Sequence, residues 1–288
     1  MAKKPEKKQP STTGHSWDGV EEYNNPLPRW WLITFYLTII WAIGYVIAYP
    51  AIPLINGATP GLLGYSSRAE VQKDIDEVNL RNAPLTERIN DLELAAIAGD
   101  EQVGEFAFNG GKAVFQTFCA QCHGSGAGGS LGYPSLIDDD WLWGGTVEDI
   151  YESISSGIRD ESNDYTRFSS MPAFGADGML GKEEIGILAS YVSALSGING
   201  AGEAELAAGQ ELYLQSCAAC HGDNGTGDRF LGAPDLTDAI WLYGSDMAAL
   251  SETITNARAG VMPAWSGRLS ESQIRQATVY IHSLGGGE

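Results

Sequence analysis

The motif Cys-x-x-Cys-His occurs twice in the chain, at residues 119–123 and 217–221. Two thiols three positions apart can form thioethers with both vinyl groups of one porphyrin, and the adjacent histidine can bind its iron, so the motif is the attachment signature of c-type haem. All four cysteines of the chain lie in these motifs, which leaves none for disulfides. The sequence therefore predicts two covalently bound haem c groups, held by Cys119, Cys122, His123, Cys217, Cys220 and His221.

A methionine followed by proline lies downstream of each motif and can supply the second axial ligand. Met171 is 48 residues after His123, and Met262 is 41 residues after His221. A thioether sulfur is a soft ligand that suits iron(II), and histidine–methionine ligation raises the reduction potential. Because both axial positions would then be filled, none is left for a substrate. This ligand set favours electron transfer over catalysis.

The same residue types allow other assignments. The four cysteines could bind zinc or form redox dithiols, although no βαβ pattern surrounds either motif. Met179 and Met247 are alternative ligands, but neither is followed by proline, and packing is the expected role of both. His282 could displace Met262, but the first copy has Ser193 at this position, and a polar surface role is expected.

The two motifs belong to a repeat of about 90 residues. Haem is a large apolar disc, so the aromatic residues of the repeat are expected to line its pocket or contact its propionates. The copies correspond at Pro134 and Pro234, Trp141 and Trp241, Trp143 and Tyr243, and the two Met-Pro pairs.

Each copy ends in a helical pattern with one apolar face. Ser270 with Gln273 three residues later predicts a capped start for the second of these helices. We expect an all-α fold with two tandem domains, at 105–198 and 203–288, joined by the glycine-rich linker 196–202. The apolar faces comprise Ile185, Leu188, Val192 and Leu195 in the first copy, and Ile274, Ala277, Ile281 and Leu284 in the second.

Residues 30–55 form an uncharged, largely apolar stretch that predicts a membrane anchor. A helix needs about 20 apolar residues to cross the hydrocarbon core, and Trp30 and Tyr49 lie where aromatic rings favour the interfaces. Pro50 and Pro53 mark the expected exit of the helix. The preceding 29 polar residues are too many for a cleaved signal peptide. We therefore expect one uncleaved transmembrane helix.

The distribution of basic residues predicts the orientation of the anchor. Lysines 3, 4, 7 and 8 and Arg29 all precede it, which places the segment 1–29 in the cytoplasm. His15 then lies on the side away from the haem motifs. The rest of the chain is expected in the periplasm, at the inner membrane. It begins with a connector, 56–104, in which Pro84 is predicted to separate two short helices.

The formal net charge of −20 argues against nucleic-acid binding and suits either solubility or a partner with a basic docking face. Anchor and haem motifs by themselves would also fit the cytochrome subunit of a periplasmic dehydrogenase. A dihaem peroxidase would need an open distal position, which the Met-Pro pairs argue against. A pure docking or assembly protein would gain nothing from two haems with high-potential ligation.

The repeats resemble class I cytochrome c domains, and the whole chain resembles the dihaem cytochrome c subunit (subunit III, CcoP or FixP) of cbb3-type cytochrome c oxidases. The stretch 14–31, Gly-His-Ser-Trp-Asp-Gly-Val-Glu-Glu-Tyr-Asn-Asn-Pro-Leu-Pro-Arg-Trp-Trp, carries the most specific part of the likeness. The resemblance implies that the carbonyls of Pro134 and Pro234 accept hydrogen bonds from the two ligand histidines. It thereby implies a second shell that orients each imidazole.

The resemblance also implies a role and a set of partners. A donor cytochrome c would reduce the periplasmic domains, and electrons would continue through a monohaem cytochrome c subunit to the haem-copper catalytic subunit that reduces oxygen. On this basis the chain is expected to be non-catalytic by itself and to act as an electron-transfer subunit of the oxidase.

Overall fold

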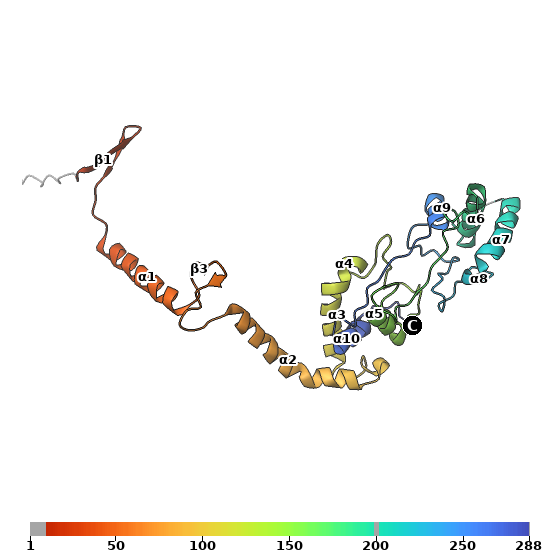
Figure 1. Cartoon of the computed structure of the whole chain (residues 1–288), viewed down its shortest axis with the longest axis horizontal. Helices are drawn as coiled ribbons and strands as arrows, with labels where there is room; N and C mark the ends of the chain where they lie inside the picture. Colours follow the sequence, from red (N-terminus) through yellow and green to blue (C-terminus); the bar gives the residue numbers. More distant parts are fainter. Residues whose placement is uncertain (1–9, 199–201, 288) are drawn as a thin grey trace, which may run out of the picture. The chain divides into compact units, whose positions relative to one another are not determined.

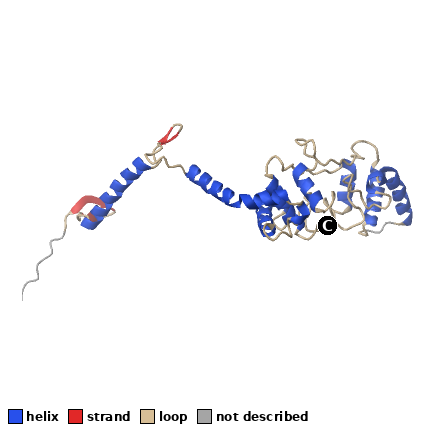
Figure 2. Cartoon of the chain, turned by 90° about the horizontal axis from the view of Figure 1, so that it is seen from below, coloured by secondary structure: helices blue, strands red, loops and turns tan. Residues whose placement is uncertain are grey.

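The computed structural model describes residues 10–198 and 202–287, and the chain divides into two compact units, Met1–Arg81 and Asn82–Glu288. Within the described residues, Figure 2 shows helices and loops throughout and strands only as short hairpins. The predicted helical fold class is therefore confirmed. The lysines at 3, 4, 7 and 8, and residues 199–201 of the predicted linker, lie outside the described residues.

The first unit contains two small antiparallel hairpins. In the first, β1 (Thr12–Trp17) pairs with β2 (Val20–Tyr23). Asp18 and Gly19 form its turn with φ of 51° and 81°, and a two-residue loop with positive φ at both positions is the geometry that Asp-Gly favours. In the second, β3 (Pro53–Leu54) pairs with β4 (Gly57–Ala58). The strands were not predicted.

Helix α1 (Arg29–Ala48) is long and apolar enough to cross a membrane, and it is the one such helix among the described residues. Its 20 residues span about 30 Å at 1.5 Å per residue, which matches the hydrocarbon core. None of its side chains is buried within the chain. The helix is shorter than the predicted segment 30–55, because it ends before Pro50 and the residues beyond it form the second hairpin.

The second unit is built of helices around the two motifs. In chain order they are the 3-10 helix η1 (Leu94–Ala96), α3 (Gly104–Val114), the π-helical turn η2 (Phe115–Cys119), α4 (Ala120–His123), α5 (Val147–Ser156), α6 (Lys182–Leu195), α7 (Glu203–Ser216), α8 (Ala218–His221), α9 (Met247–Asn256) and α10 (Glu271–His282). The capping box that Ser270 and Gln273 predict is present at the start of α10. The apolar faces predicted for α6 and α10 face the core, since Leu188 and Ala277 are almost completely buried.

A single helix, α2 (Ser67–Asp91), replaces the two short helices predicted in the connector. The prediction that Pro84 separates two helices is wrong, because Pro84 lies inside α2. Proline in a helix interior costs about 3 kcal/mol, since it removes a backbone hydrogen bond and crowds the preceding turn. Just beyond it, Leu85 and Ile89 join an apolar cluster that includes Leu94 of η1, and their burial offsets that cost.

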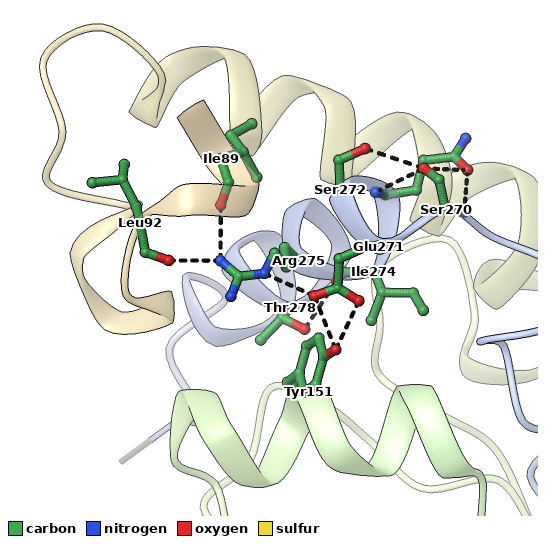
Figure 3. Close-up of polar contacts among 10 residues, drawn as sticks. Ile89, Leu92, Tyr151, Ser270, Glu271, Ser272, Ile274, Arg275 and Thr278 are labelled. Atoms are coloured by element: carbon green, nitrogen blue, oxygen red, sulfur yellow. Dashed lines mark hydrogen bonds and ion pairs between the residues drawn. The ribbon is translucent and has the colours of Figure 1, made fainter. Parts of the chain in front are cut away.

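Arg275 of α10 joins the end of α2 to the C-terminal helix (Figure 3). Its Nη1 donates hydrogen bonds to the carbonyl oxygens of Ile89 at 2.8 Å and Leu92 at 2.7 Å. The last carbonyls of a helix have no partner within the helix, so the guanidinium satisfies groups that would otherwise be unpaired. Its Nε donates to Glu271 at 2.9 Å, and the hydroxyl of Tyr151 donates to the same carboxylate at 2.8 Å.

Replacing Arg275 by alanine is expected to lower the free energy of unfolding of the second unit by about 2 kcal/mol, because two buried carbonyls and a carboxylate lose a charged donor. Hydrogen exchange should accelerate at the end of α2 and in η1. The variant Arg275→Lys keeps the charge but lacks the planar fork, so an intermediate loss is expected. Urea unfolding of the three proteins measures the series, and equal stability of all three would contradict this role.

The packing of the second unit does not follow the order of the repeats. The helix α10 of the second repeat packs on α3 and α5 of the first repeat, whereas α6 of the first repeat packs on α7 and α9 of the second (Figure 1). The predicted tandem domains 105–198 and 203–288 are therefore not the packing units. The helices α6 and α10 have similar apolar faces, so the sequence pattern alone does not specify which of them completes which half.

Candidate functional site

Each Cys-x-x-Cys-His motif ends in a one-turn helix, α4 or α8, that follows a longer helix. In both copies the first cysteine is half-buried and the second is exposed. Cys119 packs at the edge of the apolar cluster around α3 and α10, and Cys217 at the edge of the cluster around α6 and α7. Each pair of thiols therefore lies at the border between an apolar core and solvent, where the vinyl groups of a porphyrin could be reached.

The two motif histidines have the same environment. Nδ1 of His123 lies 2.9 Å from the carbonyl oxygen of Pro134, and Nδ1 of His221 lies 3.0 Å from that of Pro234. Because a carbonyl can only accept, Nδ1 carries the proton in this contact, and the lone pair of Nε2 is available for iron. Burial lowers the pKa of both histidines, partly countered by the proline carbonyl, so the neutral imidazole that binds a metal is favoured.

The half-buried cysteines are held as thiols in the absence of further chemistry. Burial raises the pKa of Cys119 to about 11, with a smaller contribution from Cys122. Cys217 has the same value for the same reasons, with Cys220 as its neighbour. The two sites thus have equal electrostatic environments, as expected for copies of one structural unit.

The structure brings each Met-Pro pair to the edge of a motif cluster, but not in sequence order. Met262 packs against the cluster that Cys119 borders, and Met171 against the cluster that Cys217 borders. Met179 has half of its side chain exposed, and Met247 is the first residue of α9. The expected packing role of Met179 is therefore not supported. His282 is the last residue of α10.

Unpaired buried donors show where a charged cofactor group would fit. Among the described residues, the indole Nε1 atoms of Trp143 and Trp241 are buried without an acceptor. A buried polar group without a partner is costly, and a haem propionate is an acceptor that would satisfy it. The indole of Trp141, in contrast, donates to the carbonyl of Gly286. The residues present therefore fit haem, including its acidic edge.

Two arginines that the sequence analysis did not single out reinforce this region. The guanidinium of Arg167 lies over the Trp143 ring, 5.6 Å from its centroid, and Arg258 lies over the Tyr243 ring at 5.3 Å. Each also donates a hydrogen bond to the backbone carbonyl of the aromatic residue it covers. The arginines occupy different positions in the two repeats, so no repeat pattern could have revealed them. They add positive charge beside the unpaired Trp143 indole and the Tyr243 ring.

A group of carboxylates from both repeats lies next to the first site. Burial raises the pKa of Asp140 to about 6, and the carboxylates of Asp238, Asp138 and Asp235 raise it further. A folded-state pKa above the ordinary value means that ionisation of Asp140 costs stability. That cost develops as the pH rises from about 4 to about 6 and is complete above this range.

The variant Asp140→Asn is therefore expected to be more stable than the native chain above pH 6 and equally stable near pH 4. Solvent screening reduces the gain to about 1 kcal/mol, or about 2–4 °C in Tm for a unit of this size. Thermal melts at the two pH values measure the difference. Asp139→Asn, at an exposed neighbour, makes the same change in charge and serves as the control; an equal gain there would refute the assignment to burial.

The helices, the paired motif sites and the methionine ligands define the class of this protein as a c-type cytochrome. A family model described as cytochrome c oxidase, cbb3-type, subunit III matches residues 107–192 and 204–281. A second, the N-terminal domain of cytochrome oxidase-cbb3, FixP, matches residues 9–56. The chain therefore belongs to the family of subunit III of cbb3-type cytochrome c oxidases.

Curated relatives are similar over the full chain. The cbb3-type cytochrome c oxidase subunit CcoP of Cereibacter sphaeroides is 55% identical, with 100% of both chains covered. Subunit FixP of Bradyrhizobium sp. (strain ORS 278) is 51% identical over 96% of each chain, and subunit CcoP of Rhodobacter capsulatus is 50% identical over 100% of each. The similarity therefore includes the N-terminal hairpin, α1 and the connector as well as the haem repeats.

Proposed function

We propose that the chain binds two haem c groups covalently and carries electrons to the oxygen-reducing centre of a cbb3-type cytochrome c oxidase. Cys119 and Cys122 form the covalent links of one site, and Cys217 and Cys220 those of the other. The axial ligands are His123, His221, Met171 and Met262. The bound haem supplies one-electron iron chemistry. The observation that carries the proposal is the pair of equivalent histidines, each anchored through Nδ1 to a proline carbonyl.

The residues of the chain fix the cofactor rather than react with a substrate. Pro134 and Pro234 hold the imidazole planes through their carbonyls, which keeps the ligand geometry similar in both oxidation states. The thioether ligands favour the reduced iron and fill the distal positions. The chain is therefore non-catalytic by itself, and oxygen is reduced in another subunit.

The relatives are named as oxidase subunits, which supports specific partners for this chain. These are the haem-copper catalytic subunit and the monohaem cytochrome c subunit, the latter receiving electrons from this chain. A donor cytochrome c supplies them. The net charge of −20 suits a donor with a basic docking face, since complementary charge raises the rate of encounter.

The location follows from α1 and the basic residues before it. We place α1 in the inner membrane as a single span, the N-terminus in the cytoplasm and the haem repeats in the periplasm. Arg29 lies at the start of α1, and the lysines at 3, 4, 7 and 8 support the same orientation. The periplasmic side is also where a diffusing donor cytochrome could reach the repeats.

A purification from membranes tests the role. The affinity-tagged full chain is isolated after gentle solubilisation, and a reduced-minus-oxidised spectrum is recorded with and without carbon monoxide. The expected result is c-type haem together with b-type haem and a haem that reacts with carbon monoxide. A parallel preparation from cells with the untagged chain controls for other oxidases. Signals of c-type haem alone, together with a dehydrogenase activity, would refute the oxidase role.

A further inference from the structure

We propose that the two repeats exchange their methionine ligands. Met262 binds the iron held by His123, and Met171 binds the iron held by His221, although the order along the chain pairs them the other way. The inference rests on the proposed function, because it requires two attached haems with methionine ligands. It adds that neither repeat can form a complete haem site by itself.

The first support comes from the apolar clusters. The cluster beside Cys119 contains Phe115 and Ile150 of the first repeat, but the helix that closes it is α10 of the second, and Met262 packs against it. The cluster beside Cys217 is closed by α6 of the first repeat, and Met171 packs against that one. Each methionine therefore lies in the half whose motif belongs to the other repeat.

The backbone around Met262 is fastened to the first repeat. Met262 and Ile158 exchange two backbone hydrogen bonds of 2.9 Å, in the pattern of an antiparallel bridge. The amide of Trp265 donates to the carbonyl of Ile154 at 3.0 Å, at the end of α5. The amide of Ala264 donates to the carboxylate of Asp160 at 2.7 Å.

The segment that carries Met171 is fastened to the second repeat in the corresponding way. The amides of Gly175 and Ala176 both donate to the carbonyl of Thr255, near the end of α9, at 3.1 and 2.9 Å. Thr255 in the second repeat corresponds to Ser155 in the first, whose carbonyl accepts from Ser266 at 3.3 Å. The two crossings are therefore related by an approximate exchange of the repeats.

The helix contacts explain why this pairing is specific. In both halves a glycine allows two helices to touch: a Cβ on Gly209 of α7 would lie 2.5 Å from Cβ of Tyr191 in α6. The contact of α3 with α10 has an additional feature, because a Cβ on Gly110 would lie 2.5 Å from Oε1 of Gln276. The corresponding residue of α7 is Ala208, whose methyl group would occupy that space. The helix that carries Gln276 therefore fits α3 better than α7.

The pairing is tested in the full chain with one haem removed. Cys217→Ala with Cys220→Ala leaves the haem held at His123 alone. In this background, Met262→Ala is expected to open the distal position, so that the reduced haem turns high-spin and binds carbon monoxide stoichiometrically. Met171→Ala in the same background is the matched control and should leave the remaining haem low-spin and unreactive.

The outcomes separate the inference from the function on which it rests. If Met171→Ala opens the remaining haem and Met262→Ala does not, the exchange is refuted but the ligand set stands. If neither variant opens it, both the exchange and the methionine ligation fail. If no haem is attached to the native chain at all, the proposed function fails as well.

A second measurement covers the case in which the one-haem background does not fold. In the intact reduced chain, methionine methyl groups are labelled with ¹³C, and Met262→Leu identifies the ligand signal that disappears. Ring-current shifts place a ligand methyl group directly over its haem. The exchange predicts a nuclear Overhauser contact between this methyl group and the haem linked to Cys119. A contact with the haem linked to Cys217 would overturn it.

Discussion

Replacing Cys119 and Cys122 by alanine should leave a chain that retains about half of its covalently bound haem. Both thioether links to that haem are then lost, whereas the second motif is intact. Haem is measured as the pyridine haemochrome of the denatured chain, because only covalently attached haem survives denaturation. Electron flow from a donor cytochrome c to oxygen should also fall steeply in membranes that contain the variant.

Two controls show whether this loss is specific. Replacing Cys217 and Cys220 should give the same haem content, and replacing all four cysteines should give none. Native chain that contains zinc and no haem would favour the alternative metal site. Native chain with a haem content that does not change when one motif is removed would contradict attachment at that motif.

The second large effect is expected for Gly111→Ala. Gly111 lies where α3 crosses α10, and a Cβ at this position would run into the backbone carbonyl of Gln276 and lie 2.7 Å from Cβ of Tyr280. A backbone group cannot move aside without displacing its helix, so overpacking should destabilise the second unit by about 3 kcal/mol. For a unit of this size the loss corresponds to about 6–12 °C in Tm.

Gly186→Ala provides a control with the same chemical change. Gly186 lies inside α6, and an added Cβ would meet nothing within 4 Å. Alanine restricts the unfolded chain more than glycine does, so this variant should gain roughly 0.5–1 kcal/mol. Thermal melts followed by haem absorbance compare the two variants. A change of the same sign in both would show that the crossing of α3 and α10 is not tightly packed.

The sequence by itself determined the features that depend on short-range chemistry. The motifs at 119–123 and 217–221 predicted haem because the spacing of thiols and imidazole matches one porphyrin. The uncharged run predicted α1, since a span is recognised by length and composition alone. The helical faces of α6 and α10 and the capping box at Ser270 were likewise local patterns, and the structure confirms them.

Only the tertiary structure decided how these parts combine. Two similar repeats offer two similar apolar helices, so sequence order suggested a pairing that packing reverses. The difference lies in contacts between distant residues, such as the space that Gly110 leaves for Gln276. The continuity of α2 through Pro84 has the same origin, because burial of Leu85 and Ile89 beyond the proline outweighs a local preference. Local patterns specify elements, whereas partner choice depends on burial that exists only after the chain has folded.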